Sequence, residues 1–179
     1  YGIDRPAHQC LAVHQHNEAQ AAQDVIARLA QGQRVAYVSD AGTPAISDPG
    51  ARLVAAVRAA GHRVLPLPGA SSVTTALSAA GVTGEGGFVF AGFLPAKGQE
   101  RQRAVQALAQ EPRAVVLLEA PHRIEALAAS LQTLGERRVT VARELTKQFE
   151  QIETLSAQAL PTWLAEKPER QRGEFVLVL

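Results

Sequence analysis

The sequence has no methionine, only one cysteine and few aromatic residues. Because Cys10 is the only cysteine, the chain can form neither an internal disulfide nor a cysteine-rich metal cage. The absence of methionine, even at position 1, indicates that the chain starts downstream of a natural N-terminus. No apolar run approaches the roughly 20 residues of a membrane span, and no signal-peptide pattern opens the chain. We therefore expect a soluble cytoplasmic protein without a membrane partner.

The charge is nearly balanced. The 179 residues include 18 basic and 17 acidic side chains, which give a formal net charge of +1. This balance does not indicate a sequence-independent nucleic-acid binder, although arginines can still gather on one face. Hydrophobic residues make up 46% of the chain, enough for the core of one large α/β domain or of two small ones.

Short β-branched runs alternate with helical periodicity, which predicts an α/β fold. The expected strands cover 34–39, 62–67, 88–93, 113–120, 138–145, 148–155 and 174–179. The expected helices cover 17–31, 53–60, 72–80, 99–110, 122–134 and 156–166, the first of them capped by Asn17. Four glycines within 81–87 favour a linker there. We expect an N-terminal α/β subdomain of residues 1–83 and a C-terminal α/β subdomain of residues 84–179.

A turn-rich loop, SDAGTPAISDPG, covers 39–50 and follows the first expected strand. Ligands in open α/β sheets bind outside the carboxyl ends of strands. Here Asp40 offers a carboxylate, while Ala41 and Gly42 leave room for a ligand near the backbone. A structural turn explains the same residues equally well, because Thr-Pro and Asp-Pro-Gly are common turn sequences.

The sequence PGASSV at 68–73 follows the second expected strand. Exposed amides and the hydroxyls of Ser71 and Ser72 at a helix start can hold a polar or anionic group. Taken alone, the pattern favours ordinary capping of the next helix by one of the two serines.

Two further polar motifs follow later strands, and a third lies near the start. EAPHR at 119–123 brings several polar groups to one strand end, and RELTK at 143–147 is either a site or a solvated charge cluster. HQHNE at 14–18 contains two alternating histidines. Metal binding would need a third ligand that the sequence does not show, so we expect no metal site.

Together these motifs resemble one family. SDAGTPAISDPG at 39–50 is similar to the characteristic motif of the ribosomal RNA small-subunit methyltransferase I branch of the tetrapyrrole methylase superfamily. The same order of motifs continues through the chain. They are HQHNE, LPGASSVTTALSAAG from Leu67, FAGFLP from Phe90, EAPHR, ARELTK from Ala142 and GEFVLV from Gly173.

The resemblance implies two α/β subdomains with S-adenosylmethionine in a cleft between them, and a homodimer. It implies that the family's first strand, with its glycine-rich loop, is missing here. The motifs also imply which residues bind the cofactor. They are Asp40, Ala41, Gly42 and Thr43 in the first loop, Ser71 and Ser72 in the second, and Leu118, Ala142 and Gly173 beside the adenosine.

The reaction implied is methylation of the ribose 2′-hydroxyl of a cytidine in small-subunit ribosomal RNA. A ribose hydroxyl is a poor nucleophile, so a base or a cation near the forming alkoxide would help. The candidates, among which the sequence does not choose, are Glu119, His122, Glu144 and Lys147. The arginines that could meet RNA phosphates are Arg101, Arg103, Arg123 and Arg143.

Two alternatives remain open. One is a different branch of the superfamily, which methylates a carbon of a tetrapyrrole, such as a precorrin or uroporphyrinogen, or a modified histidine. The motif at 39–50 argues against it. The other is a nonenzymatic nucleotide-binding or regulatory α/β module, which predicts no turnover even in the complete protein.

Overall fold

The computed structural model describes residue 6 and residues 9–39, 42–84 and 86–179. The chain divides into two compact units, Tyr1–Ala70 and Ser71–Leu179. No helix among the described residues is long and apolar enough to cross a membrane. Each unit is described separately below.

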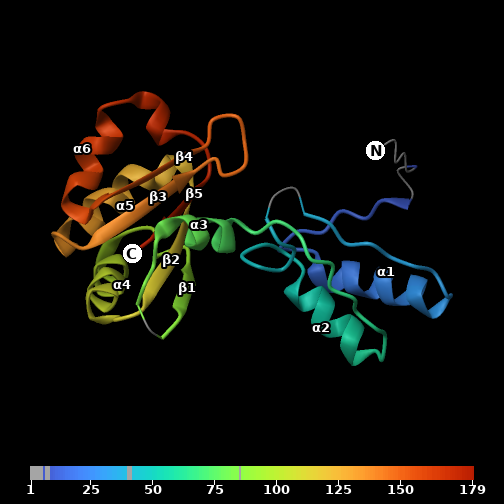
Figure 1. Cartoon of the computed structure of the whole chain (residues 1–179). Coiled ribbons are helices and arrows are strands. Elements are labelled where there is room, and N and C mark those ends of the chain that lie inside the picture. The colour runs from blue at the N-terminus through green and yellow to red at the C-terminus, as the bar shows by residue number, and fades with distance from the viewer. Residues whose placement is uncertain (1–5, 7–8, 40–41, 85) are drawn as a thin grey trace. The chain divides into compact units, whose positions relative to one another are not determined.

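The second unit contains a five-stranded mixed sheet in the order β1-β2-β5-β3-β4 (Figure 1). Its strands are β1 (Phe88–Gly92), β2 (Ala114–Glu119), β3 (Arg138–Arg143), β4 (Gln151–Ser156) and β5 (Phe175–Val178). β1 and β2 are parallel, whereas β5 is antiparallel to both β2 and β3, and β4 is antiparallel to β3. Strands β1, β2 and β3 therefore run in the same direction.

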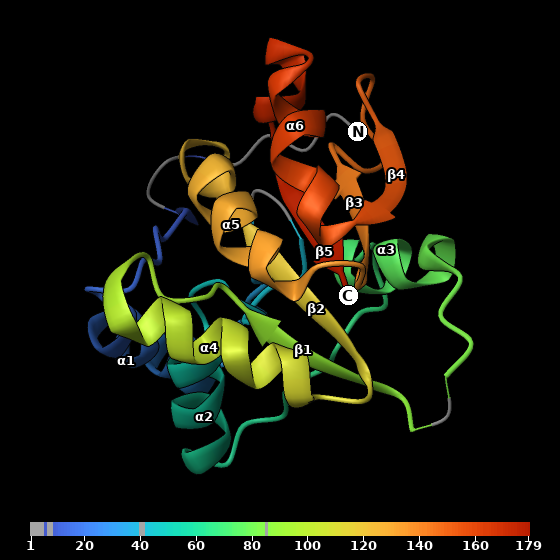
Figure 2. The same ribbon diagram turned by 90° about the vertical axis from the view of Figure 1, so that its left-hand side faces the viewer.

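Helices cover both faces of this sheet. α4 (Gly98–Gln110), α5 (Ile124–Leu131) and α6 (Leu160–Ala165) lie together on one face, in front of the sheet in Figure 2. Their apolar side chains pack with Leu117, Val141 and Leu177 in the largest buried cluster. α3 (Ser72–Ala80) packs on the other face, where Ala76 contacts a second cluster that includes Val176. Short 3-10 turns complete the unit at Pro121–Arg123, Gln132–Leu134, Ala157–Ala159 and Pro168–Gln171.

The first unit consists of α1 (Glu18–Ala30), α2 (Ala51–Ala59) and extended segments. The two helices pack through small and branched side chains, among them Ala22, Val25 and Leu53. The buried carboxylate of Glu18 accepts a hydrogen bond from the backbone N–H of Arg52 at 3.1 Å, and so satisfies an amide at the start of α2. Asn17 precedes α1 but does not cap it. Its side chain instead bonds His14 N and Ala12 O.

Two of the seven expected strands are wrong. Residues 34–39 and 62–67 are extended, but they form no strand. Val38 is 79% exposed and Leu67 is 89% exposed. A strand is stabilised by ladder hydrogen bonds and by side-chain pairs with its neighbours, and neither segment has such a neighbour among the described residues.

The other five strands and all six helices are confirmed, with small shifts at their ends. β3 ends at Arg143 rather than at 145 because Glu144 and Thr146 have positive φ angles of 49° and 65°. The helix α3 packs with the sheet of the second unit, although the predicted boundary at 83/84 assigns it to the first subdomain. The assignment of two subdomains, with a cofactor cleft, stays a prediction.

Candidate functional site

Four of the sequence motifs meet at one edge of the sheet. Because β1, β2 and β3 run in the same direction, their carboxyl ends lie at this edge, where β5 begins. Phe175, the first residue of β5, pairs with both Glu119 and Arg143. We call this the carboxyl edge. It gathers the ends of the motifs FAGFLP, EAPHR, ARELTK and GEFVLV, at the position where open α/β sheets bind ligands.

A buried charge cluster lies at the carboxyl edge. Glu119, only 2% exposed, forms ion pairs with Arg123 Nε at 2.9 Å and with Arg101 Nη2 at 3.6 Å. Its Oε1 also accepts a hydrogen bond from the N–H of Ala120 at 3.0 Å. We call Glu119, Arg101 and Arg123 the Glu119 cluster. Since two guanidinium groups surround one carboxylate, the cluster carries a net positive charge.

The prediction that Arg101 meets phosphates is wrong for this structure. Arg101 is only 4% exposed, because α4 turns its side chain toward the sheet, where Glu119 compensates its charge. Arg143 is buried as well, and its Nη1 donates to the carbonyl oxygen of Arg172 at 3.0 Å. Arg103 is exposed and Arg123 is partly exposed, so for these two the contact with phosphates stays a prediction.

The Glu119 cluster fixes the loop that follows β1. Arg101 Nε donates to the carbonyl oxygen of Pro95 at 2.6 Å, and Arg123 Nη2 donates to that of Leu94 at 2.5 Å. The side chain of Leu94 is buried in the core. Glu119 thus holds two arginines that in turn hold two consecutive carbonyls, a role that sequence reasoning missed. The only hint in the sequence was the pairing of one acidic residue with an arginine four positions later.

A second charge network joins β3 to β5. Lys147 Nζ bonds Glu144 Oε1 at 3.1 Å and Glu174 Oε2 at 2.9 Å, and the N–H of Glu174 donates to Glu144 Oε1 at 2.8 Å. The backbone N–H of Glu174 and the ammonium group of Lys147 lower the pKa of Glu144. Hydrogen bonds to Glu174 and Glu144 raise the pKa of Lys147.

Gly173 belongs to the same network for a steric reason. Its φ angle is +90°, and a Cβ at this position would clash with the side chain of Glu144. A residue other than glycine would therefore be strained and would displace the Glu144 carboxylate. The structure thus places Gly173 beside Glu144; its predicted contact with adenosine stays a prediction.

The four catalytic candidates have different environments. Glu119 is buried in an ion-paired cluster, and Glu144 is held ionised by its hydrogen bonds. A general base must reach the acceptor hydroxyl, which the buried Glu119 does not, and it works best with a pKa near the working pH, from which the pKa of Glu144 is moved away. Lys147 is exposed and held as a cation. His122 is exposed on the turn that follows β2.

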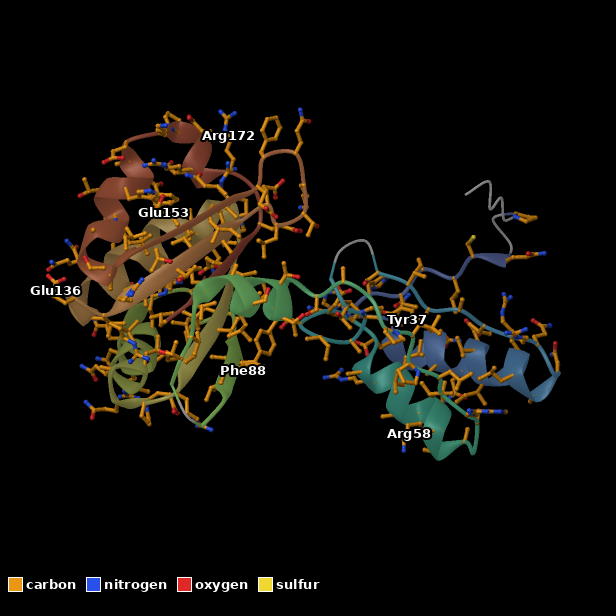
Figure 3. The ribbon with its side chains drawn as sticks, viewed as in Figure 1. Tyr37, Arg58, Phe88, Glu136, Glu153 and Arg172 are labelled. Carbon is orange, nitrogen blue, oxygen red and sulfur yellow. The ribbon has the colours of Figure 1, made fainter. Side chains whose placement is uncertain are left out.

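The loop at 39–50 is only partly described, because Asp40 and Ala41 lie outside the described residues. Gly42 has a left-handed φ of 69°, and Thr43 Oγ1 donates to the carbonyl oxygen of Ala70 at 3.3 Å. The far end of the loop is held by Tyr37, whose hydroxyl donates to the carbonyl oxygen of Pro49 at 2.5 Å (Figure 3).

Sequence reasoning also missed Tyr37. Burial raises the pKa of its hydroxyl, and the nearby Asp48 and Glu18 raise it further, so the group stays a neutral donor. Its ring occupies the space that a Cβ at Gly50 would need, and Gly50 has a φ of 122°. Because Gly50 has no side chain, the backbone of the loop can pack directly on the ring of Tyr37. The turn sequence alone did not predict this contact.

The serines of PGASSV lie at the start of α3. Ser71 occupies the N-cap position in an extended conformation, but its hydroxyl makes no capping hydrogen bond. The capping expected from the sequence is therefore not made by Ser71. Instead its carbonyl oxygen accepts a bond from Thr74 Oγ1 at 3.2 Å. Ser71 and Ser72 are both partly exposed.

Leu118 and Ala142 both pair with Val176 and so lie on the face of the sheet that α3 covers. Ala142 has no exposed surface, whereas Leu118 is partly exposed. Their contact with adenosine stays a prediction. Within the described ranges there is no group of three or more metal-binding side chains, and the rings of His14 and His16 are 6.1 Å apart.

The sequence is similar to a known protein family and to several named proteins. A sequence model of the family described as Tetrapyrrole (Corrin/Porphyrin) Methylases matches residues 3–161. A relative from Pseudomonas aeruginosa named ribosomal RNA small subunit methyltransferase I is 45% identical over 100% of this chain and 63% of its own length. A relative of the same name from Vibrio cholerae is 49% identical over 94% of this chain and 59% of its own length. The chain thus spans about 60% of these relatives.

Solved structures show the same fold. Cobalt precorrin-4 methyltransferase, a cobalamin biosynthetic enzyme, has a TM-score of 0.67 at 17% identity, with 98% of this chain and 76% of that chain covered. Uroporphyrin-III C-methyltransferase from Thermus thermophilus, solved with S-adenosyl homocysteine, has a TM-score of 0.59 at 16% identity, with 94% and 75% covered. At these identities the likeness concerns the fold alone.

Proposed function

This chain belongs to the family of tetrapyrrole (corrin/porphyrin) methylases, and we propose that its protein methylates the ribose 2′-hydroxyl of a cytidine in small-subunit ribosomal RNA. The observation that carries this proposal is the 45–49% identity to ribosomal RNA small subunit methyltransferase I along nearly the whole chain. The structural neighbours named as tetrapyrrole methyltransferases are far more distant, at 16–23% identity.

The methyl donor in this proposal is S-adenosylmethionine, and the described residues suit it chemically. The donor carries a carboxylate, an ammonium group and ribose hydroxyls. Ser71 and Ser72 offer partly exposed hydroxyls at a helix start, and Ser71 does not use its hydroxyl as a cap. Gly42 offers an exposed backbone in the loop before α2, and the Thr43 hydroxyl, which donates to the carbonyl oxygen of Ala70, keeps its oxygen as an acceptor. When bound, this group supplies a methyl on a sulfonium centre for in-line transfer to an oxygen.

The chain's own residues would orient the acceptor hydroxyl and manage its proton. Holding the hydroxyl in line supplies much of the acceleration in such a transfer. Among the four candidates, His122 is the exposed group best suited to accept the proton. Lys147, kept cationic by Glu144 and Glu174, is suited to stabilise the developing alkoxide. Glu119 acts indirectly, through the loop that its cluster holds.

We expect the substrate to be the assembled small subunit rather than a short RNA, and the protein to act in the cytoplasm as a homodimer. A net charge of +1 gives little general attraction for phosphates, so affinity must come from shape and from a few placed arginines. The exposed alanines of α2, such as Ala55 and Ala59, would allow close packing against a second copy.

A tritium-transfer assay with the complete protein tests this function. Three acceptors are offered in parallel: assembled small subunits, a short cytidine-containing oligonucleotide and uroporphyrinogen III. We expect strong labelling of the subunits, weak labelling of the oligonucleotide and none of the tetrapyrrole. Labelling of the tetrapyrrole would instead support a C-methyltransferase. Cofactor binding by calorimetry without labelling of any acceptor would support a nonenzymatic module.

A further inference from the structure

Phe93 is an exposed aromatic residue that directly precedes an anchored stretch of backbone. It follows directly on β1 at the carboxyl edge and is 49% exposed. Isolated exposed apolar residues are common and need no explanation by themselves. Phe93 differs because the backbone beyond it is anchored by the buried Glu119 and Arg101 and the partly exposed Arg123.

The anchoring comes from the Glu119 cluster. Arg123 bonds the carbonyl oxygen of Leu94, and Arg101 bonds that of Pro95, the two residues after Phe93. The side chain of Leu94 is 7% exposed and points into the core. With Leu94 turned inward and two carbonyls held, the backbone on the carboxyl side of Phe93 is fixed in place. Such preorganisation lowers the entropic cost of binding a ligand on the ring.

The same cluster places a positive charge over the ring. The guanidinium carbon of Arg123 lies 6.0 Å from the ring centre of Phe93, and the Arg123 side chain is 25% exposed. A planar aromatic face beside a partly exposed guanidinium group is how proteins hold unpaired bases of single-stranded RNA, the ring stacking on the base and the cation meeting the backbone. The excess positive charge favours an anionic partner over a neutral apolar surface, and the exposed aromatic ring favours a nucleic acid among anionic partners because it can stack on a base.

We propose that Phe93 is the stacking platform for a base of the substrate RNA at or beside the methylated nucleotide, and that Arg123 contacts its backbone. This inference rests on the proposed RNA substrate. It assigns Phe93 a role in specificity and makes Glu119 and Arg101 positioning residues, which act through the Phe93–Pro95 loop.

The test compares Phe93→Leu, Phe93→Trp and a control, Phe88→Leu, in the complete protein. Phe88 is 46% exposed and lies at the opposite, amino end of the same strand (Figure 3). Filter binding measures affinity for assembled small subunits, tritium transfer measures kcat and KM, and calorimetry measures S-adenosylmethionine affinity. Loss of base stacking weakens RNA binding by roughly tenfold or more.

We expect Phe93→Leu to raise both Kd and KM for subunits about tenfold, with kcat and cofactor affinity nearly unchanged. Phe93→Trp should restore binding because it keeps an aromatic face, and Phe88→Leu should match the wild type. The inference is overturned if Phe93→Leu binds subunits as tightly as the wild type, or if Phe88→Leu loses as much affinity as Phe93→Leu. In either case, methylation of subunits by the wild type still supports the proposed function. If the wild type binds subunits without methylating them, the function fails, and the binding series alone decides the role of Phe93. If the wild type does not bind subunits at all, both proposals fail.

Discussion

In the second unit the apolar run of β2 is largely buried, with Val115, Val116 and Leu117 at 1% exposure or less. In the first unit the comparable run at 34–39 leaves Val38 at 79% exposure and forms no strand. The two runs have similar composition, but β2 pairs with β1 and β5, whereas 34–39 has no strand partner among the described residues. The difference shows that apolar, β-branched composition makes a segment ready to pair, whereas the partners decide whether it becomes a buried strand.

The two units also differ in what their buried carboxylates do. Removing these carboxylates gives the largest expected change in the free energy of unfolding. Replacing Glu119 by Ala leaves two guanidinium groups without their counter-charge, so we expect a loss of roughly 3–5 kcal/mol in the free energy of unfolding. In the first unit, Glu18 satisfies one backbone amide of α2, and Glu18→Ala should cost roughly 0.5–2 kcal/mol. Urea denaturation of both variants measures the two values.

The Glu119→Gln variant serves as the control for shape, because it keeps the volume and removes only the charge. Its loss should lie close to that of Glu119→Ala if charge compensation is what matters. Equal losses for Glu119→Ala and Glu18→Ala would contradict the distinction between a cluster that carries net charge and a helix cap.

Shortening a buried apolar side chain gives the second largest expected loss in the free energy of unfolding. Leu177 is fully buried in β5, the central strand, so Leu177→Ala should lower the free energy of unfolding by roughly 2–5 kcal/mol. Leu67 in the first unit is 89% exposed, and Leu67→Ala should change it by no more than about 0.5 kcal/mol. Thermal and urea unfolding check both. A large loss in Leu67→Ala would mean that this segment is buried in solution and that the contrast between the units is false.

The smallest effect concerns pH. Hydrogen bonds to Glu174 and Lys147 hold the pKa of Glu144 below its ordinary value of 4.5. A carboxylate whose folded pKa is lowered stabilises the fold above its unfolded pKa, and that contribution disappears as pH falls through the folded pKa. The melting temperature of the wild type should therefore be slightly higher than that of Glu144→Gln at pH 7. The difference between the two melting temperatures should vanish well below pH 4.5.

The companion variant for this prediction is Lys147→Met. Because Lys147 and Glu144 share a hydrogen bond, the two substitutions should be less than additive in melting temperature at pH 7. A difference between the wild type and Glu144→Gln that stays constant from pH 7 into acid would show that the amide perturbs packing rather than charge.

Much of the fold could be read from the sequence. The periodicity of 99–110 and of 122–134 predicted α4 and α5, since a helix face that meets a sheet must repeat its apolar residues every three or four positions. The strands of the second unit were predicted because their apolar runs are bounded by glycine and proline turns. The expected strands at 34–39 and 62–67 failed because composition carries no information about whether a neighbour is present.

The candidate site was only partly predictable. Strand–loop order indicated that Glu119 and the residues around Glu144 follow strand ends, and the sheet does bring these motifs to one edge. The sequence could not show that Arg101, eighteen positions before Glu119, turns inward to pair with it. It therefore assigned to RNA a side chain that the fold uses internally, and it gave no role to Phe93.

The sequence by itself determined the α/β class, the helices, the strands of the second unit and the family, because these depend on local periodicity and on motif order. Only the tertiary structure decided which charged residues are available for chemistry. The direction of β5 brings Glu174 to Glu144, and the packing of α4 brings Arg101 to Glu119. Burial and ion pairing depend on groups that are distant in the chain, and so the same arginine or glutamate can be a surface contact or an internal anchor.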